Sequence, residues 1–495
     1  MIEKISKEEI KYFFKRSTIS CEENMWICQL CPESKKKIKQ KIGTGFTNLR
    51  THIINVHPNW QACKSVQSKL NHFIRPKSSH LYGWLKKVIL NCQPISIVEN
   101  PIELEFTTLK PICRKTLKEA IVNTSEEVKS IISKIIPSKF CICFDAWTEN
   151  KIHFIGIYAI FNDLNNTPQN VLLAFTTLVD ESNWTAQNYA DTISNVLESF
   201  NKSVLNVVCL IGDNCNTNKR LATLLKPPLV GWTSHKLNLA VENYLEDFPV
   251  IKIINQLMIK ISTPLKLAKL RTLTSLKPIT RNSTRWSSCF QMIDRFFTIK
   301  DYLDIVDTDI AELMPNQIQI IQLQNLMNEL RLLNELTIYL QKSHINLADV
   351  RKCFDKVTLK HQKMKKFLDV NAPIVHSPKF DTAVIKVLNE NEETLDDEER
   401  EFISSLIQNP NNRSVSTEFS TNPFIVSSTR NLKTSEYMNL NFIPATSNMV
   451  ERLFSLSRRM YSDHRKSLNN TTLENIIFLN QNNKFWNEET VDKSI

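Results

Sequence analysis

The pattern of apolar residues in the middle of the chain predicts a sheet. Apolar runs of four to nine residues bounded by polar ones are typical of buried strands. We expect strands at residues 140–148, 153–161, 171–178 and 204–211, with a helix over 184–199. The first run is a buried strand that ends on Asp145, and the fourth is followed by Asp213. These elements predict the first part of an α/β core over residues 140–245.

Helical periodicity is found on both sides of this core. Apolar positions that recur every three or four residues mark a helix face turned toward a core. They occur over residues 113–136, 251–268, 289–306, 316–343, 346–369 and from Val450 to Tyr461. We therefore expect a multidomain protein, with a linker and helical segment over residues 63–139, a large all-α insertion over 246–439 and a helical C-terminal region over 440–495.

Four residues near the N-terminus have the spacing of a zinc site. Cys28 and Cys31 are separated by two residues, and His52 and His57 follow on a predicted helix. Two thiolates from a tight turn and two imidazoles one helical turn apart suit a closed tetrahedral Zn²⁺ site. A segment as small as residues 8–62 would depend on such a metal for much of its folding.

The formal net charge of the chain is +11, and all of it lies in the first 90 residues. This stretch has 17 lysines and arginines against 6 acidic residues, whereas the remainder is formally neutral. Such asymmetry of charge indicates an N-terminal module that binds a polyanion, most often nucleic acid. The alternative is a basic face that only makes the protein soluble. The candidates for phosphate contacts are Lys35, Lys36, Lys37, Lys39, Lys41 and Arg50.

The composition argues against several classes of protein. Twelve cysteines without a secretory signal after Met1 indicate a reducing compartment, where thiols or metal ligands are expected rather than disulfides. The longest apolar runs are too short to span a bilayer, so no membrane partner is expected. Only six glycines occur, and neither a GxxxxGK[ST] nor a GxGxxG phosphate-binding motif is present.

Three acidic residues that are far apart in the sequence are candidates for one site. Asp145 and Asp213 each follow an apolar strand, and adjacent strand ends would bring them together. Two neighbouring carboxylates repel each other, and a divalent cation removes that repulsion. Each aspartate alone is also a common turn or cap residue, and Glu451, beside an apolar helix stripe, is also a common solvated residue.

Several motifs resemble two known families. Residues 440–483 resemble the C-terminal dimerisation region of the hAT transposase superfamily, and residues 8–62 resemble a BED zinc finger. The motifs are Trp26 ahead of the cysteine pair, Asp145-x-Trp-Thr, Gly-Asp213-Asn214, Thr-Arg285-Trp286, Glu451-Arg452-Leu453-Phe454-Ser455, the basic pair Arg465-Lys466 and the helix through Leu473, Ile476, Ile477 and Leu479.

The resemblance implies an RNase H-like α/β core interrupted by the all-α insertion. Members of the hAT family have a catalytic Asp-Asp-Glu site that binds magnesium or manganese. The resemblance implies that Asp145, Asp213 and Glu451 form this site here. His235 would lie at the edge of this site; the alternative is a capping or core histidine. Trp232 stands where the family has a cysteine.

The same resemblance implies that Arg285 contacts DNA near the cleavage point and that Trp286 stacks on an extruded base; the alternative for Trp286 is a core residue. The implied function is a DNA transposase, which binds double-stranded DNA, cleaves phosphodiester bonds with two metal ions and transfers strands. The alternative is a domesticated, catalytically inactive DNA-binding transcriptional regulator. We expect a structural zinc ion, a homodimer or higher homo-oligomer through apolar pairing of the C-terminal helices, and a nuclear location.

Overall fold

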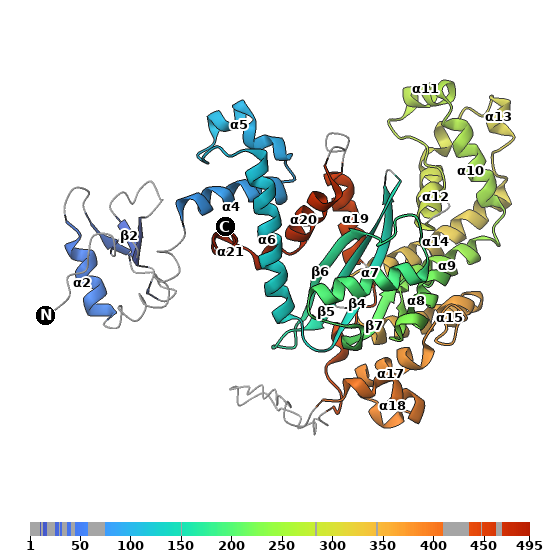
Figure 1. Cartoon of the computed structure of the whole chain (residues 1–495). Helices are drawn as coiled ribbons and strands as arrows, with labels where there is room; N and C mark the ends of the chain where they lie inside the picture. Colours follow the sequence, from blue (N-terminus) through green and yellow to red (C-terminus); the bar gives the residue numbers. More distant parts are fainter. Residues whose placement is uncertain are drawn as a thin grey trace, which may run out of the picture. The chain divides into compact units, whose positions relative to one another are not determined.

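The protein is mixed α/β in the computed structural model (Figure 1). The structure describes residues 10, 13–16, 25–28, 30–31, 37–40, 45–57, 75–149, 151–282, 285–342, 345–408, 435–446, 448–461 and 468–495. The chain divides into two compact units: Met1–Trp84, Thr108–Lys110 and Asn487–Ile495 form the first, and Leu85–Thr107 and Pro111–Trp486 form the second. Within the described part of the chain, no helix combines the length and the apolar character needed to cross a membrane.

The first unit contains a small antiparallel sheet and a helix packed on it. Its elements are β1 (Phe14–Arg16), β2 (Met25–Cys28), β3 (Lys37–Lys39), α2 (Thr47–Val56), most of α4 (Pro76–Ile89) and α21 (Glu488–Lys493). The strand order is β1-β2-β3. The buried core consists of Ile10, Phe13, Phe14, Cys28, Leu49 and Ile53. Helix α2 confirms the helix predicted to carry the two histidines.

A five-stranded mixed sheet is the centre of the second unit. Its strands are β4 (Phe140–Glu149), β5 (Ile152–Asn162), β6 (Pro168–Thr177), β7 (Val207–Gly212) and β8 (Leu229–Gly231). The order is β6-β5-β4-β7-β8, with β6, β5 and β4 antiparallel and β4, β7 and β8 parallel. The four predicted strands are confirmed, and β8 is additional.

One expectation about these strands is wrong. Asp145 was expected at the end of the strand predicted over residues 140–148, but this strand runs to Glu149 and has Asp145 in its interior. The reason is its antiparallel partner: β5 pairs with β4 along this whole stretch, as far as Glu149 and Ile152. Asp145 therefore lies inside a strand, with its backbone held on that side by the partner.

Different helices cover the two faces of the sheet. The helices that pack on its strands are α7 (Ala186–Ser199), α8 (Asn216–Leu225), α19 (Asn448–Met460) and α20 (Asn470–Gln481). Helix α6 (Arg114–Ile135) packs on α20, and α9 (Thr233–Leu245) follows β8 in the chain. Gly156 of β5 faces α19, because a Cβ atom there would lie 2.6 Å from Leu453 Cδ2. His153, three positions earlier, points to the other face, where it contacts Tyr189 of α7.

The rest of the second unit is helical. Its helices are α5 (Pro101–Phe106), α10 (Val250–Ile261), α11 (Pro264–Leu273), α12 (Ser287–Ile299), α13 (Thr308–Ala311), α14 (Gln317–Leu340), α15 (Leu347–Lys360), α16 (Lys365–Leu368), α17 (Pro378–Leu388) and α18 (Asp397–Ile403). The helix predicted over residues 251–268 is two helices. Pro264 has no amide proton, so it ends the first helix and begins the second.

Glu474 on α20 is a mostly buried acid whose pKa is raised to about 6, chiefly by burial. The charge of Glu181 also raises this pKa, whereas Thr176, Thr177 and Lys129 lower it. A carboxyl group with a raised pKa favours the folded state when protonated. That contribution is complete below the unfolded pKa of 4.5 and is lost as the pH rises through 6.

We expect Glu474→Gln to stabilise the protein relative to wild type by up to about 2 kcal/mol near pH 7, and by little near pH 4. Urea unfolding at a series of pH values measures the difference. Glu198→Gln, at an exposed position of α7, is the control. A stability difference that does not depend on pH would contradict the expectation.

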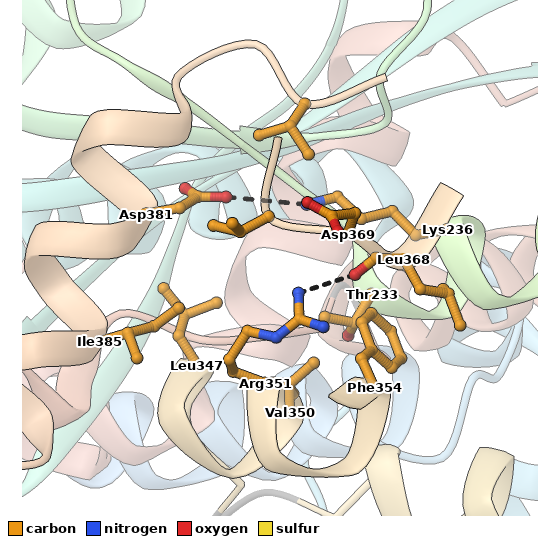
Figure 2. Close-up of a pocket in the computed structure, with 12 residues that line it drawn as sticks. Thr233, Lys236, Leu347, Val350, Arg351, Phe354, Leu368, Asp369, Asp381 and Ile385 are labelled. Carbon is orange, nitrogen blue, oxygen red and sulfur yellow. Dashed lines mark hydrogen bonds and ion pairs between the residues drawn. The ribbon is translucent and has the colours of Figure 1, made fainter. Parts of the chain in front are cut away.

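A buried ion pair joins α9 to α17 (Figure 2). Lys236 Nζ lies 3.7 Å from Asp381 Oδ2, and each side chain is only 10% exposed. Burial raises the pKa of Asp381, and the charge of Lys236 opposes this. Both residues line a cavity with Arg351, whose guanidinium donates to the Leu368 carbonyl at 2.7 Å.

We expect Asp381→Leu alone to lower the free energy of unfolding by about 3–5 kcal/mol, because Lys236 would then be a buried charge without its partner. The double variant Lys236→Met/Asp381→Leu is expected to recover most of this loss, since two apolar side chains suit the buried position. Chemical denaturation of the single and double variants measures both. If the stability loss of the double variant equals the sum of the losses of the two single variants, the two charges do not depend on each other.

Candidate functional site

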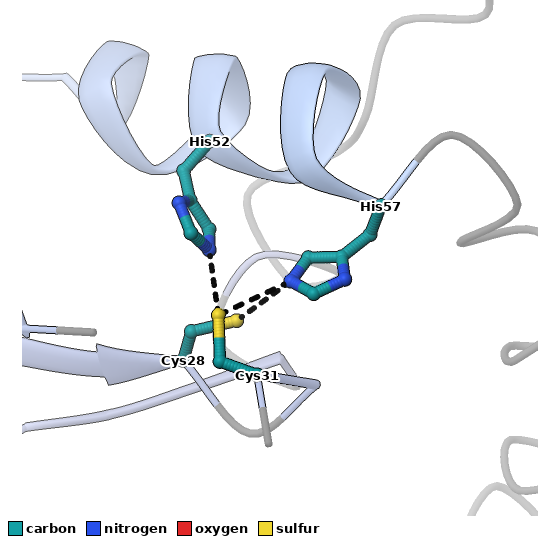
Figure 3. Close-up of side chains that lie close together, drawn as sticks. All are labelled: Cys28, Cys31, His52 and His57. Atoms are coloured by element: carbon teal, nitrogen blue, oxygen red, sulfur yellow. Dashed lines mark hydrogen bonds between the residues drawn. The ribbon is translucent and has the colours of Figure 1, made fainter. Parts of the chain in front are cut away.

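The four predicted zinc ligands come together in the first unit (Figure 3). Cys28 ends β2, Cys31 follows in the next turn, and His52 and His57 come from α2 and its end. Cys31 Sγ lies 3.4 Å from His52 Nε2 and 3.4 Å from His57 Nε2, and Cys28 Sγ lies 3.5 Å from His57 Nε2. Sulfur and nitrogen atoms that share one tetrahedral zinc ion are about 3.5 Å apart.

The surroundings of the cluster support zinc binding. Cys28 is fully buried, and this burial raises the pKa of its thiol. A thiolate at such a place is stable only with a nearby cation, and zinc supplies one. The residues therefore fit a structural zinc ion, which would add to the small hydrophobic core of this unit.

The basic residues of this unit are only partly described. Lys37 and Lys39 are exposed on β3, and Arg50 on α2 is half-buried. The other candidates for phosphate contacts, Lys35, Lys36 and Lys41, lie outside the described residues. The same holds for the basic pair at residues 465–466. Their contacts with DNA stay predictions.

The second unit brings Asp145 and Asp213 to neighbouring positions. Strands β4 and β7 are parallel, and their register pairs Cys143 with Ile211. Asp145 lies two residues beyond Cys143 on β4, and Asp213 lies two residues beyond Ile211, directly after the end of β7. The two acids therefore lie near each other, because adjacent strands are about 4.8 Å apart. The Asn218 side chain holds Asp213 in place: its Nδ2 donates to Asp213 Oδ1 at 2.6 Å.

Glu451 joins these two acids from the first turn of α19. Burial raises the pKa of Asp145 to about 7, the charges of Asp213 and Glu451 raise it as well, and the hydrogen bond from the Ala146 amide opposes the rise. Asp213 and Glu451, from distant parts of the sequence, are therefore close enough for their charges to act on Asp145. The charges of Asp145 and Asp213 also act on the Tyr189 hydroxyl. The pKa of Tyr189 is raised to about 12, first by burial and then by the charges of Cys215, Asp145 and Asp213.

The three carboxylates do not converge into one tight cluster. Among the residues that the structure describes, only the four zinc-type ligands form a group whose ligand atoms all lie within 4.8 Å of one another. Glu451 instead forms an ion pair with Arg285, whose Nη2 lies 3.4 Å from Glu451 Oε2. Because three like charges repel, an arginine beside one of them lowers the energy of the arrangement.

Gly156 has no side chain, and this allows α19 to pack closely on the sheet. Gly156 pairs with Asp145 in the β4–β5 register, so both residues face the same side. Leu453, Val450 and Phe454 of α19 fill the space above Gly156. The helix that carries Glu451 can therefore approach Asp145 closely only because this position lacks a Cβ atom.

Gly156→Ala is accordingly expected to destabilise the second unit by about 1–3 kcal/mol, because the new methyl group overpacks a site where Leu453 is fully buried. Thermal unfolding followed by circular dichroism measures the loss. Gly45→Ala is a suitable control, since its Cβ would meet only Thr47 Oγ1, at 4.0 Å. Equal melting temperatures for wild type and Gly156→Ala would show that α19 does not need this gap.

An open pocket next to Glu451 contains the other predicted site residues. Its lining includes Trp232, His235, Arg285, Trp286 and Glu451. Arg285 is exposed and His235 is half-buried. Trp286 is only 3% exposed, and its amide donates to Asn238 Oδ1 at 3.1 Å. The Trp286 ring would have to move before it could stack on a DNA base.

Sequence reasoning missed Asn218, which bonds to Asp213, and a row of polar residues on the opposite face of the sheet. Asn218 lies five positions after Asp213, in the first turn of α8, and this spacing could have indicated a side chain that returns to the strand end. Thr148, His153 and Tyr189 form a hydrogen-bonded row: Thr148 Oγ1 lies 2.8 Å from His153 Nδ1, and His153 Nε2 lies 2.5 Å from the Tyr189 hydroxyl. No spacing in the sequence connects residues on β4, β5 and α7.

Comparison with known families identifies the C-terminal part of the chain. Residues 437–483 match the family model described as the hAT family C-terminal dimerisation region. The chain therefore carries a hAT dimerisation region, which confirms the predicted resemblance to this family and supports homo-oligomerisation. The Cys₂His₂-type cluster fits a BED finger. No curated protein matches the chain.

The Leu-rich helix of this region packs inside its own chain. Leu473, Ile476, Ile477 and Leu479 of α20 are buried, and the helix packs against β6 and α6. These four side chains are therefore occupied and are not free to pair with a second copy. The predicted pairing of C-terminal helices through these four side chains is therefore not supported, and homo-oligomerisation through residues 437–483 would use other side chains.

Proposed function

We propose that this chain is a DNA transposase of the hAT type, or a protein derived from one. Its second unit would contain an RNase H-like catalytic core, with residues 246–439 as an all-α insertion. The observation that carries the proposal is that Asp213 and Glu451, which are far from Asp145 in the sequence, are close enough to it in the fold for their charges to raise its pKa. The hAT dimerisation region and the strand order β6-β5-β4-β7-β8 support it.

Asp145, Asp213 and Glu451 would hold magnesium or manganese, because carboxylate oxygens are the donors that these hard cations prefer. Such ions activate water and stabilise the leaving 3′ oxygen when a phosphodiester is cleaved. Arg285 lines the adjacent pocket and pairs with Glu451, and its guanidinium would exchange this carboxylate for a DNA phosphate. His235 faces the same pocket and would contact the backbone near the cleaved bond.

The first unit would recognise double-stranded DNA through a BED-type zinc finger. The zinc ion would hold α2 against β2, and lysines such as the exposed Lys37 and Lys39 of β3 would neutralise phosphates. This contact is electrostatic, so the affinity should fall steeply as the salt concentration rises. A chain that acts on chromosomal DNA would work in the nucleus.

The test is to incubate the full chain, with Mg²⁺ or Mn²⁺, with labelled duplexes that carry the genomic sequences on either side of its coding region. The expected result is strand breaks at the ends of flanking repeats, and only when the divalent ion is present. Absence of breaks at every duplex tested, with intact folding, would overturn the proposed cleavage activity.

One observation favours a second function, that of a domesticated, catalytically inactive DNA-binding regulator. Glu451 is paired with Arg285, and the three carboxylates are not gathered into one cluster among the described residues. Trp232, in place of the family cysteine, lines the same pocket. Zinc-dependent binding to the flanking duplexes without any strand breaks would identify this function.

A further inference from the structure

Helix α2 of the first unit turns one side to the core and the other side to solvent. Leu49, His52 and Ile53 are buried, and Figure 3 shows the two histidines directed toward the two cysteines. On the other side, five exposed side chains fall on one stripe of the helix at 3.6 residues per turn. They are Thr47, Asn48, Thr51, Ile54 and Asn55. We call these five residues the outer face of α2.

The outer face carries no charged side chain. Helix α2 contains no acidic residue and no lysine, and its one arginine, Arg50, is half-buried. In the major groove of DNA, arginine and lysine read guanine, and acidic side chains accept a hydrogen bond from cytosine. An asparagine amide fits the N6 and N7 atoms of adenine, and apolar groups contact the methyl group of thymine. The outer face therefore suits adenine and thymine and lacks the charged groups that read guanine or cytosine.

A local hydrogen bond decides which group of Thr51 faces outward. Thr51 Oγ1 donates to the Thr47 carbonyl at 3.0 Å, so the hydroxyl is turned back to the helix and the methyl group is left on the outside. Ile54, which is 40% exposed, adds a second apolar group next to it. Asn55 lies one turn after Thr51, and its side chain is exposed. The outer face thus presents an apolar contact and an amide side by side.

Exposed lysines lie beside the outer face. Asn48 Nδ2 donates to the Lys39 carbonyl at 3.1 Å, and this bond ties the first turn of α2 to β3. Lys37 and Lys39 of β3 are exposed, so their ammonium groups can bind phosphates next to a groove that the helix enters. An α-helix with its side chains is about 10–12 Å wide, and the major groove of B-DNA is about 12 Å wide. The outer face therefore fits between the two rows of phosphates that border this groove.

We infer that α2 reads A·T base pairs in the major groove. The Asn55 amide bonds to the N6 and N7 atoms of adenine, and the Thr51 methyl group, with Ile54 beside it, packs on the methyl group of thymine. Lys37 and Lys39 bind phosphates, which fix the position of the helix but carry no sequence information. This inference rests on the proposed DNA binding of the first unit and adds the base pairs that the unit selects.

The first test compares the affinity of the full chain for two duplexes of equal length, one of alternating A·T pairs and one of alternating G·C pairs. Fluorescence anisotropy at one salt concentration measures both. The A·T duplex is expected to bind at least about fivefold more tightly, since one good amide–adenine contact already discriminates by about this factor. Both duplexes have the same number of phosphates, so the electrostatic part of the affinity is equal. Equal affinities would overturn this inference alone, whereas no binding of either duplex would also overturn the proposed DNA binding.

The second test removes single contact atoms from the DNA and from the protein. In the A·T duplex, uracil in place of thymine removes the methyl group, and deaza-adenine in place of adenine removes N7. Each change is expected to weaken the binding of wild type by about threefold or more. Thr51→Ser keeps the hydroxyl and loses the methyl group, so it should lose most of the response to uracil and keep the response to deaza-adenine. Asn55→Ala should show the reverse.

Each of the two variants is therefore the control for the other. A zinc content equal to that of wild type shows that the first unit is folded in both. Wild type that binds both modified duplexes as tightly as the unmodified one would overturn the inference without any variant. If Thr51→Ser and Asn55→Ala both respond to the modified duplexes as wild type does, the bases are read by other residues and the inference fails.

Discussion

Replacing Asp145 with asparagine is expected to reduce divalent-ion-dependent DNA cleavage by at least about 10²-fold, with little change in DNA affinity. Loss of a residue that only supports a metal ligand already costs about 10–100-fold, and Asp145 is proposed as a ligand itself. DNA binding should persist, because it rests on the zinc finger and on phosphate contacts. Single-turnover cleavage and a filter-binding titration of the same duplex measure the two effects.

Asp191→Asn is the matched control for this experiment, because Asp191 is exposed on α7 of the same unit. It should cleave DNA as wild type does. The folded state should also tolerate the change at position 145, since Asn removes a carboxylate that is buried next to two others. Wild-type cleavage by Asp145→Asn would exclude this residue from the reaction and leave the regulator as the better account.

Replacing Cys28 with serine is expected to remove the zinc ion from the first unit and to abolish specific DNA binding with it. Zinc binding supplies roughly 10–16 kcal/mol to the folding of small zinc-finger peptides. The core of this unit is small and includes Cys28 itself, so the remaining contacts cannot replace the metal. Zinc analysis of the purified chain and gel-shift titration of the flanking duplexes measure the loss.

Cys113→Ser is the control for this variant, because Cys113 is exposed just before α6 and lies outside the cluster. It should retain about one zinc ion per chain and wild-type affinity. The sheet of the second unit should remain folded in both variants, since it belongs to a separate compact unit. Full zinc content in Cys28→Ser would show that the cluster has been assigned to the wrong residues.

The local elements of this protein could be predicted because each depends on neighbours in the sequence. Four strands and the helix of the zinc cluster are where periodicity places them. The error at β4 arose because pairing with another strand decides where this strand ends. Strand β4 passes Asp145 because β5 pairs with it to Glu149, and this pairing leaves no sign in the residues of β4 alone.

The zinc site shows how far spacing can identify function. Its ligands come in two short-range pairs on elements with regular geometry, so few arrangements of the chain are compatible with them. Glu451 is different, because more than two hundred residues separate it from Asp213. Periodicity could place it on a helix but could not show which strand this helix meets.

The sequence by itself determined the ligands of the zinc site, the strand and helix types and the hAT character of the C-terminal region, because these depend on residue type and short-range spacing. Only the tertiary structure decided that Asp145 has Asp213 and Glu451 as neighbours, that Arg285 pairs with Glu451, and that α20 is buried in its own chain. Such contacts depend on how the sheet orders its strands and on a gap at Gly156 that admits α19. Both are properties of packing between distant segments, and local sequence does not encode them separately.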